Sequence, residues 1–140
     1  MQRQINLLLS AIFFSVIIIS GSKLFKAEKG IITTVSNIEG TPIKIMKPEQ
    51  SNGILVFIAH GFAGSSSFMR PIAVSLTQAG FTTIRFDFLG HGENNLPYSG
   101  SISQISGATQ SFINQTNSVI DYYKNLYDPN SIILLGHSMA

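Results

Sequence analysis

Three short strand-like segments, each followed by a turn that contains glycine, constrain the fold of this chain most strongly. They span Ile54–Ala59, Phe81–Phe88 and Ser131–Leu135. Ile54–Ala59 is apolar throughout, which is typical of a strand buried on both faces of a parallel sheet, and Ser131–Leu135 is predicted to be the next buried strand. Helical patterns lie between them, at about Phe68–Gln78 and Gly107–Tyr127, and the second stops before Pro129, which cannot continue a helix. This alternation predicts an α/β fold with a mostly parallel sheet, flanking helices and right-handed crossovers.

Two more strands are predicted ahead of these. Gly30–Val35 and Thr41–Met46 are β-branched runs separated by a turn at Asn37–Gly40. Such a pattern indicates an antiparallel pair at the start of the sheet. A chain of 140 residues with 44% hydrophobic residues has the size and the apolar content of one globular domain. We assign that domain to residues 30–140.

An uncharged, apolar segment precedes the domain. No charge occurs in the 19 residues of Gln4–Ser22, and a helix of that length measures about 28 Å, close to the thickness of the hydrocarbon core of a membrane. The segment fits an uncleaved membrane anchor. It also fits a signal peptide, because Arg3 precedes it and small residues at positions 20–22 permit cleavage before Lys23. We therefore expect a membrane-anchored or exported protein of the cell envelope, with residues 1–29 as anchor or signal plus linker.

The composition argues against several kinds of site. Charged residues make up 11% of the chain, with a net charge of +2, and the basic ones are scattered, so no nucleic-acid partner is expected. The lack of cysteine excludes disulfides, a thiol nucleophile and thiolate metal sites. The three histidines lie on separate turns without a His-x-x-x-His pair, and the glycine turns lack phosphate-binding motifs. We therefore expect no metal and no cofactor.

The turns after the three strands carry short motifs. They are His60–Gly64, Leu89–Asn94 and Gly136–Ala140, which read HGFAG, LGHGEN and GHSMA. Gly61 and Gly64 can adopt positive φ and thereby turn backbone N–H groups towards a ligand. The third motif fits G-x-S-x-small, in which a serine on a tight strand-to-helix turn needs small residues two positions to either side so that its hydroxyl can project. Its last position, commonly glycine, is Ala140.

In this order and spacing, HGFAG, RFDFLGHG and GHSMA resemble the N-terminal half of the α/β-hydrolase superfamily, and in particular bacterial-type serine esterases and acyl hydrolases. The resemblance covers residues 54–140, and residues 31–53 fit loosely as its opening strands. It implies an α/β-hydrolase fold and hydrolysis of carboxylic esters or related acyl bonds through an acyl-enzyme intermediate. It also implies a small-molecule ester or acyl substrate.

The resemblance gives roles to individual residues. Ser138 matches the nucleophile, and the backbone N–H groups of Phe62 and Met139 match the two donors of an oxyanion hole. The supporting residues of the two turns are His60, Gly61, Gly136 and His137. The imidazole of His60 is expected to hydrogen-bond to neighbouring loops, and Asp87 is expected to stabilise a loop rather than serve as the catalytic acid.

The general base and its acid partner are not expected in this part of the sequence. All three histidines precede Ser138, whereas triads on this fold run serine, then Asp or Glu, then histidine. We expect the acid and the histidine after residue 140, so that residues 1–140 by themselves form an inactive N-terminal portion of a hydrolase. The alternative is a truncated or degenerate relative that binds a ligand or has no activity. Glu93, at a position often occupied by serine in relatives, receives no role.

Overall fold

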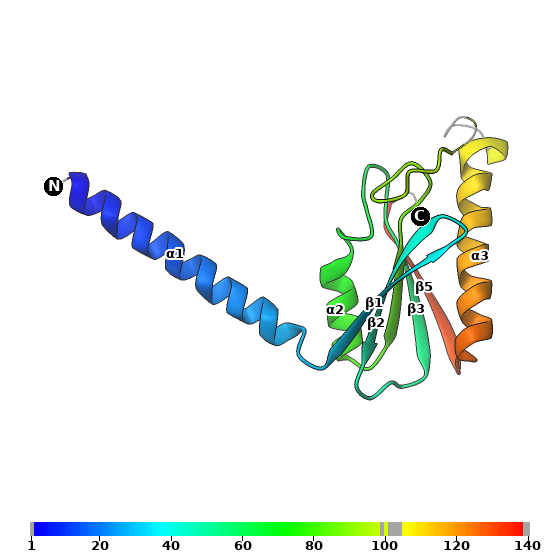
Figure 1. Ribbon diagram of the computed structural model, residues 1–140, viewed down its shortest axis with the longest axis horizontal. Coiled ribbons are helices and arrows are strands. Elements are labelled where there is room, and N and C mark those ends of the chain that lie inside the picture. Colours follow the sequence, from blue (N-terminus) through cyan, green and yellow to red (C-terminus); the bar gives the residue numbers. More distant parts are fainter. Residues whose placement is uncertain (1, 99, 101–104, 139–140) are drawn as a thin grey trace. The chain divides into compact units, whose positions relative to one another are not determined.

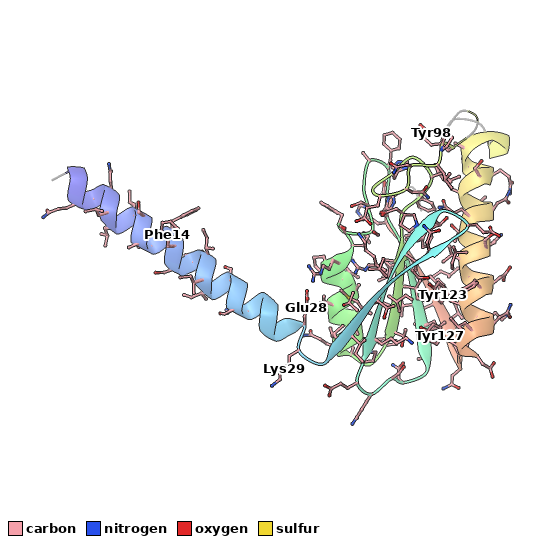
Figure 2. All side chains as sticks on the ribbon, viewed as in Figure 1. Phe14, Glu28, Lys29, Tyr98, Tyr123 and Tyr127 are labelled. Carbon is pink, nitrogen blue, oxygen red and sulfur yellow. The ribbon has the colours of Figure 1, made fainter. Side chains whose placement is uncertain are left out.

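The computed structural model describes residues 2–98, 100 and 105–138. The chain forms two compact units, residues 1–30 and 31–140. The first unit is a single helix, α1 (Gln2–Ala27), so the apolar helix predicted from the sequence is confirmed. Its span Gln4–Lys23 is long and apolar enough to cross a membrane, and none of that span is buried. Figure 2 shows its side chains, among them Phe14, projecting from the ribbon.

The second unit is built on a five-stranded sheet in the order β1-β2-β4-β3-β5 (Figure 1). The strands are β1 (Ile31–Ile38), β2 (Thr41–Pro48), β3 (Ile54–Ala59), β4 (Thr82–Phe86) and β5 (Ser131–Gly136). β1 and β2 form the predicted antiparallel pair, and β2 is also antiparallel to β4. β3 lies between β4 and β5 and is parallel to both. The α/β fold is therefore confirmed. The described sheet is mixed rather than mostly parallel, because two of its pairings are antiparallel and the two parallel ones join the strands that precede the motifs.

Two helices cover opposite faces of this sheet (Figure 1). They are α2 (Arg70–Gln78) and α3 (Gln110–Tyr127), and a short distorted helical segment, η1 (Ile105–Thr109), leads into α3. The predicted end of the second helix is confirmed, because α3 stops at Tyr127 and is capped by Asp128, whose φ is 42°. α2 begins slightly later than predicted, and Pro71 lies in its first turn. Backbone N–H groups in the first turn have no acceptor within the helix, so the N–H that proline lacks costs no helical hydrogen bond.

Alternating side chains of β4 face the two helices. Ile84 and Phe86 belong to the buried cluster that packs against α3. Thr83 lies on the other face, where its hydroxyl oxygen is 3.1 Å from that of Thr77 on α2. Arg85 shares the face of Thr83, because side chains along a strand repeat every second residue. Every residue of β4 is buried, so this strand carries a charged side chain into the interior on its α2 side.

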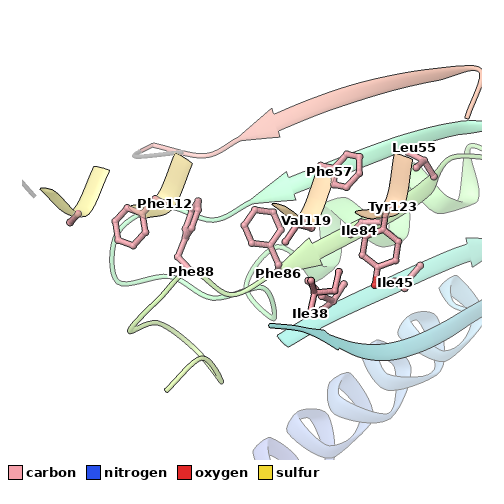
Figure 3. Close-up of a cluster of buried hydrophobic side chains, with 12 residues drawn as sticks. Ile38, Ile45, Leu55, Phe57, Ile84, Phe86, Phe88, Phe112, Val119 and Tyr123 are labelled. Atoms are coloured by element: carbon pink, nitrogen blue, oxygen red, sulfur yellow. The ribbon is translucent and has the colours of Figure 1, made fainter. Parts of the chain in front are cut away.

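The main core lies between the sheet and α3 (Figure 3). It consists of Ile38, Ile43, Ile45, Leu55, Phe57, Ile84, Phe86, Phe88, Ala108, Phe112, Val119 and Tyr123. Full burial of a large apolar side chain contributes about 1.5–3 kcal/mol relative to exposure. Phe112, Val119 and Tyr123 recur at helical spacing along one side of α3, which confirms the apolar face predicted for this helix.

The expectation of a buried strand at residues 131–135 is wrong for the described part of the chain. The side chains of Ile133 and Leu134 in β5 are 43% and 63% exposed. β5 pairs with β3 along one edge, and no described strand pairs with its other edge. Leu134 borders an apolar groove of about 500 Å³ between β5 and α3, with Phe57, Phe112 and other residues. An apolar strand is buried only where other elements cover it, and the described residues cover β5 incompletely.

Candidate active site

The two turns that carry Gly61 and Ser138 meet because β3 and β5 are adjacent parallel strands in register. Ala59, the last residue of β3, pairs with Gly136, the last residue of β5. The pairing continues for one more hydrogen bond, since the His137 N–H donates to the Ala59 carbonyl at 3.1 Å. The carboxyl ends of parallel strands lie at the same edge of a sheet, which is where ligands bind in open α/β folds.

Ser138 has the strained backbone that is typical of a nucleophile elbow, the tight turn after a strand that carries a nucleophilic serine. Its φ is 59°, a left-handed conformation that costs a residue other than glycine about 1–2 kcal/mol. Its side chain is exposed. Strain of this kind is concentrated at functional sites, where the surrounding fold holds it in place. Met139 and Ala140 lie outside the described residues, so the backbone N–H assigned to Met139 has no position here.

Gly61 allows the two turns to approach each other closely. A Cβ atom on Gly61 would lie 2.8 Å from the His137 carbonyl oxygen and 2.9 Å from the Ser138 Cβ. These separations are shorter than real Cβ contacts, so no side chain fits at this position. The expectation of positive φ at Gly61 and Gly64 is wrong, because the residue of this turn with positive φ is Ala63, at 55°. Glycine is needed here for close packing against the elbow.

Phe62 presents a backbone donor at this junction. Among the described residues, none accepts a hydrogen bond from its N–H, which leaves that group available to a ligand. Phe62 is 61% exposed, and its ring packs edge-on against His91, with 5.9 Å between ring centroids. A pocket of about 160 Å³ opens at the same turn, lined by His60, Gly61, Phe62, Ala63, Gly64, Phe68, Met69 and His137.

His60 is buried and connects the start of this turn to the end of β4. Its Nδ1–H donates to the Gly61 carbonyl at 2.8 Å, and its Nε2 accepts the Phe88 N–H at 3.1 Å. An imidazole nitrogen that accepts a hydrogen bond carries no proton, so the ring is neutral. Burial lowers the pKa of His60, and this outweighs the opposing effects of the Gly61 hydrogen bond and of Asp87. The Asp87 carboxylate, 3.9 Å from Nε2, therefore forms no ion pair with this ring near neutral pH.

The neutral, buried state of His60 predicts a pH-dependent stability. Because the pKa of the folded state lies below the ordinary value of 6.5, the unfolded chain binds a proton more readily, and stability falls as the pH drops from that value through the folded pKa. We expect the melting temperature to decrease between about pH 7 and about pH 5, and the decrease to be smaller in His60→Gln, which does not titrate in that range. Melting curves across this range test it, and an equal slope in both proteins would contradict the assignment.

The Asp87 carboxylate joins two loops instead of facing Ser138. Its Oδ1 accepts the Ser66 N–H at 2.6 Å, and its Oδ2 accepts the Glu93 N–H at 3.2 Å. The Glu93 side chain in turn pairs with Lys44 of β2 at 2.6 Å. That pair is largely exposed on the Glu93 side, and such pairs contribute at most about 1 kcal/mol. Sequence reasoning missed this partner of Glu93, because β2 and the β4 turn are far apart along the chain.

A base for Ser138 is not found in the part of the chain that the structure describes. No hydrogen bond joins the Ser138 hydroxyl to any histidine or carboxylate among residues 2–98, 100 and 105–138. Both ring nitrogens of His60 are occupied, and Nδ1 of His91 bonds to the Leu89 carbonyl at 2.8 Å. The same residues contain no group of three or more histidine and carboxylate side chains placed to hold a metal ion.

Several solved structures share this fold, and one of them is a carboxyl esterase. TT1662 from Thermus thermophilus is 21% identical, with a TM-score of 0.64 over 79% of this chain and 48% of that protein. A thermostable carboxyl esterase from Bacillus coagulans is 16% identical, with a TM-score of 0.63 over 79% and 37%. Est1E from Butyrivibrio proteoclasticus is 23% identical, with a TM-score of 0.58 over 76% and 43%. The chain thus spans less than half the length of each of these proteins.

The sequence itself matches a family of hydrolases over most of the domain. No curated protein matches the chain. Residues 50–139, however, match the family described as serine aminopeptidase, S33. The matched range begins just before β3 and ends just after Ser138, so it contains both turns described above. The chain therefore belongs to the S33 serine aminopeptidase family of α/β hydrolases.

Proposed function

We propose that the protein is a serine hydrolase that cleaves a carboxylic ester or a related acyl bond of a small molecule through an acyl-enzyme. The observation that carries this proposal is the packing of Gly61 against Ser138, a serine with a strained backbone. The residue after Gly61 is Phe62, whose N–H has no acceptor among the described residues. A nucleophile next to a preorganised backbone donor is the arrangement that acyl transfer requires.

In this mechanism Ser138 Oγ bonds to the acyl carbon while its proton passes to a general base. The carbonyl oxygen becomes an oxyanion that the N–H groups of Phe62 and Met139 stabilise, each by about 3–4 kcal/mol in the transition state. The bond to the leaving group then breaks, and the leaving group takes the proton from the base. A water molecule then attacks the acyl carbon while the base takes its proton. The bond between Ser138 Oγ and the acyl carbon breaks, Oγ takes the proton from the base, and the carboxylic acid is released. The base and its acid partner are assigned to the sequence after residue 140.

Covalent labelling of Ser138 in the whole gene product tests this proposal. A fluorophosphonate reacts with an activated serine hydroxyl and yields an adduct that mimics the tetrahedral intermediate. We expect a single labelled peptide that contains Ser138. The degenerate, non-catalytic alternative predicts a folded protein that the probe does not label.

We further propose that residues 1–29 bring the domain to the cell envelope, as an uncleaved anchor or as an export signal. The apolar span Gln4–Lys23, without a buried residue, supports this. We expect Phe14→Lys to reduce the fraction of protein in membranes or exported, since a lysine at the centre of a spanning helix costs about 2.5–3.5 kcal/mol. Gln4→Lys is the matched control, because a lysine at the end of the span can extend to the interface and lies far from the cleavage site at residues 20–22.

Cell fractionation measures this effect, and the mass of the purified protein separates the two forms. An intact N-terminus in the membrane fraction indicates an anchor, whereas a mature protein that begins at Lys23 indicates a cleaved signal. Wild-type protein that is soluble in the cytoplasm with residues 1–29 intact would contradict the proposal.

A further inference from the structure

Two charged side chains at the end of β4 hold the backbone of Ser66 at both of its polar groups. Asp87 Oδ1 accepts the Ser66 N–H at 2.6 Å, and Arg85 Nη1 donates to the Ser66 carbonyl at 2.9 Å. Arg85 belongs to β4 and Asp87 directly follows it, so the two side chains lie on the same face. Together they fix one residue of the loop that connects the oxyanion turn, residues 60–64, to α2.

This arrangement is deeply buried. The exposed fractions of Ser66, Arg85 and Asp87 are 0%, 2% and 1%. Charged side chains are rarely buried to this extent, because removing a charge from water is unfavourable even when the charge is paired and hydrogen-bonded. Apolar residues of similar size often stabilise an interior at least as well. Stability alone is therefore a weak explanation for two buried charges that meet on one backbone residue.

The end of β4 holds the oxyanion turn at both of its ends. At the start of the turn, the Phe88 N–H donates to His60 Nε2 at 3.1 Å. After the turn, Arg85 and Asp87 hold Ser66. The segment between these two points contains Phe62, whose N–H has no acceptor among the described residues. Its position relative to Ser138 is therefore set by the two anchored ends and by the packing of Gly61.

We propose that Arg85 and Asp87 are positioning residues that set the Phe62 N–H relative to Ser138 Oγ, acting through Ser66. This inference rests on the proposed serine-hydrolase function. An oxyanion donor must lie about 2.7–3.1 Å from the developing charge. A displacement of about 1 Å lowers the rate by about 100-fold. Loss of the anchor at Ser66 therefore affects the chemical step more than substrate binding.

The test compares the whole gene product with the double variant Arg85→Met/Asp87→Asn. This variant removes both charges together, so neither is left unpaired in the interior. Methionine cannot donate to the Ser66 carbonyl, and the asparagine amide sets an NH₂ group against one of the two N–H groups that Asp87 accepts. Asp87→Asn alone is the milder second variant, for the case in which the double variant does not fold.

Thr83→Val is the matched control. Thr83 is on the same strand and the same face, is 0% exposed, and loses only its contact with Thr77. For each protein, kcat and KM are measured with a p-nitrophenyl ester, the number of reactive serines is titrated with a fluorophosphonate, and folding is checked by a melting curve. Dividing kcat by the titrated sites removes the effect of any unfolded fraction.

We expect kcat per titrated site to fall by about 10- to 100-fold in the double variant, with KM changed by less than about threefold. Asp87→Asn should lose about tenfold, and Thr83→Val should stay within about twofold. A folded double variant with kcat per site within about threefold of wild type would overturn the positioning role while leaving the hydrolase proposal intact. If the wild-type protein is not labelled at Ser138, both proposals fall together.

Discussion

Replacing Ser138 with alanine is expected to abolish fluorophosphonate labelling and to lower kcat for a p-nitrophenyl ester by about 10⁴- to 10⁶-fold in the whole gene product. The reason is that alanine has no atom that can bond to the acyl carbon, so no acyl-enzyme forms. The residual rate comes from the oxyanion donors and from substrate binding. Labelling is read by mass spectrometry of the digested protein, and turnover by release of p-nitrophenol.

Ser75→Ala is the control for this substitution. Ser75 is an exposed serine of α2, and its hydroxyl donates to the Pro71 carbonyl at 3.1 Å within the helix. Its loss should leave labelling and turnover unchanged. Persistent labelling in Ser138→Ala would move the nucleophile to another residue. A wild-type protein that is folded but never labelled would favour the non-catalytic relative over the hydrolase.

The position of Ser138 could be predicted from the sequence because its signal is local. The elbow is a continuous stretch in which an apolar strand, a glycine and a serine follow one another, and no distant residue is needed to identify it. The parallel pairing near the site could be predicted for a similar reason. Short apolar runs that alternate with helical patterns predict parallel strands, and β3 is parallel to both β4 and β5.

The reason for glycine at position 61 could not be predicted in this way. It depends on the register between β3 and β5, which sets Ala59 beside Gly136 although the two are far apart in the sequence. The sequence suggested positive φ, which is the commonest local reason for glycine. The close approach to Ser138 is a tertiary contact, and hydrophobic periodicity carries no information about such a contact.

The anchor on Ser66 was missed for a related reason. In FTTIRFDF the charged residues Arg85 and Asp87 alternate with apolar ones, which in a half-exposed strand means that they face water. β4 is instead covered on both faces, so the same alternation carries two charges into the interior. Central strands in which charges alternate with apolar residues are therefore a sequence signal for buried polar networks, provided that helices on both sides are also predicted.

Gly61→Ala is expected to lower kcat by about 100-fold or more, a larger effect than most single methyl groups produce. The new Cβ would lie 2.8 Å from the His137 carbonyl oxygen and 2.9 Å from the Ser138 Cβ. Both neighbours belong to the elbow, so the oxyanion turn and the elbow must move apart. That movement displaces the Phe62 N–H and the nucleophile in opposite directions. The measurement is kcat per reactive serine in the whole gene product.

Gly21→Ala supplies the matched control for the added methyl group. A Cβ at Gly21 meets no atom within 4 Å, so this variant should retain wild-type kcat. Overpacking at position 61 also costs about 1–3 kcal/mol of stability, and a melting curve separates that loss from the catalytic one. If Gly61→Ala remains folded and keeps more than about a third of the wild-type kcat per site, the two turns do not form a common oxyanion site. The close contact of Gly61 with Ser138 would then be a feature of packing alone, and the Phe62 N–H would lose its assigned role.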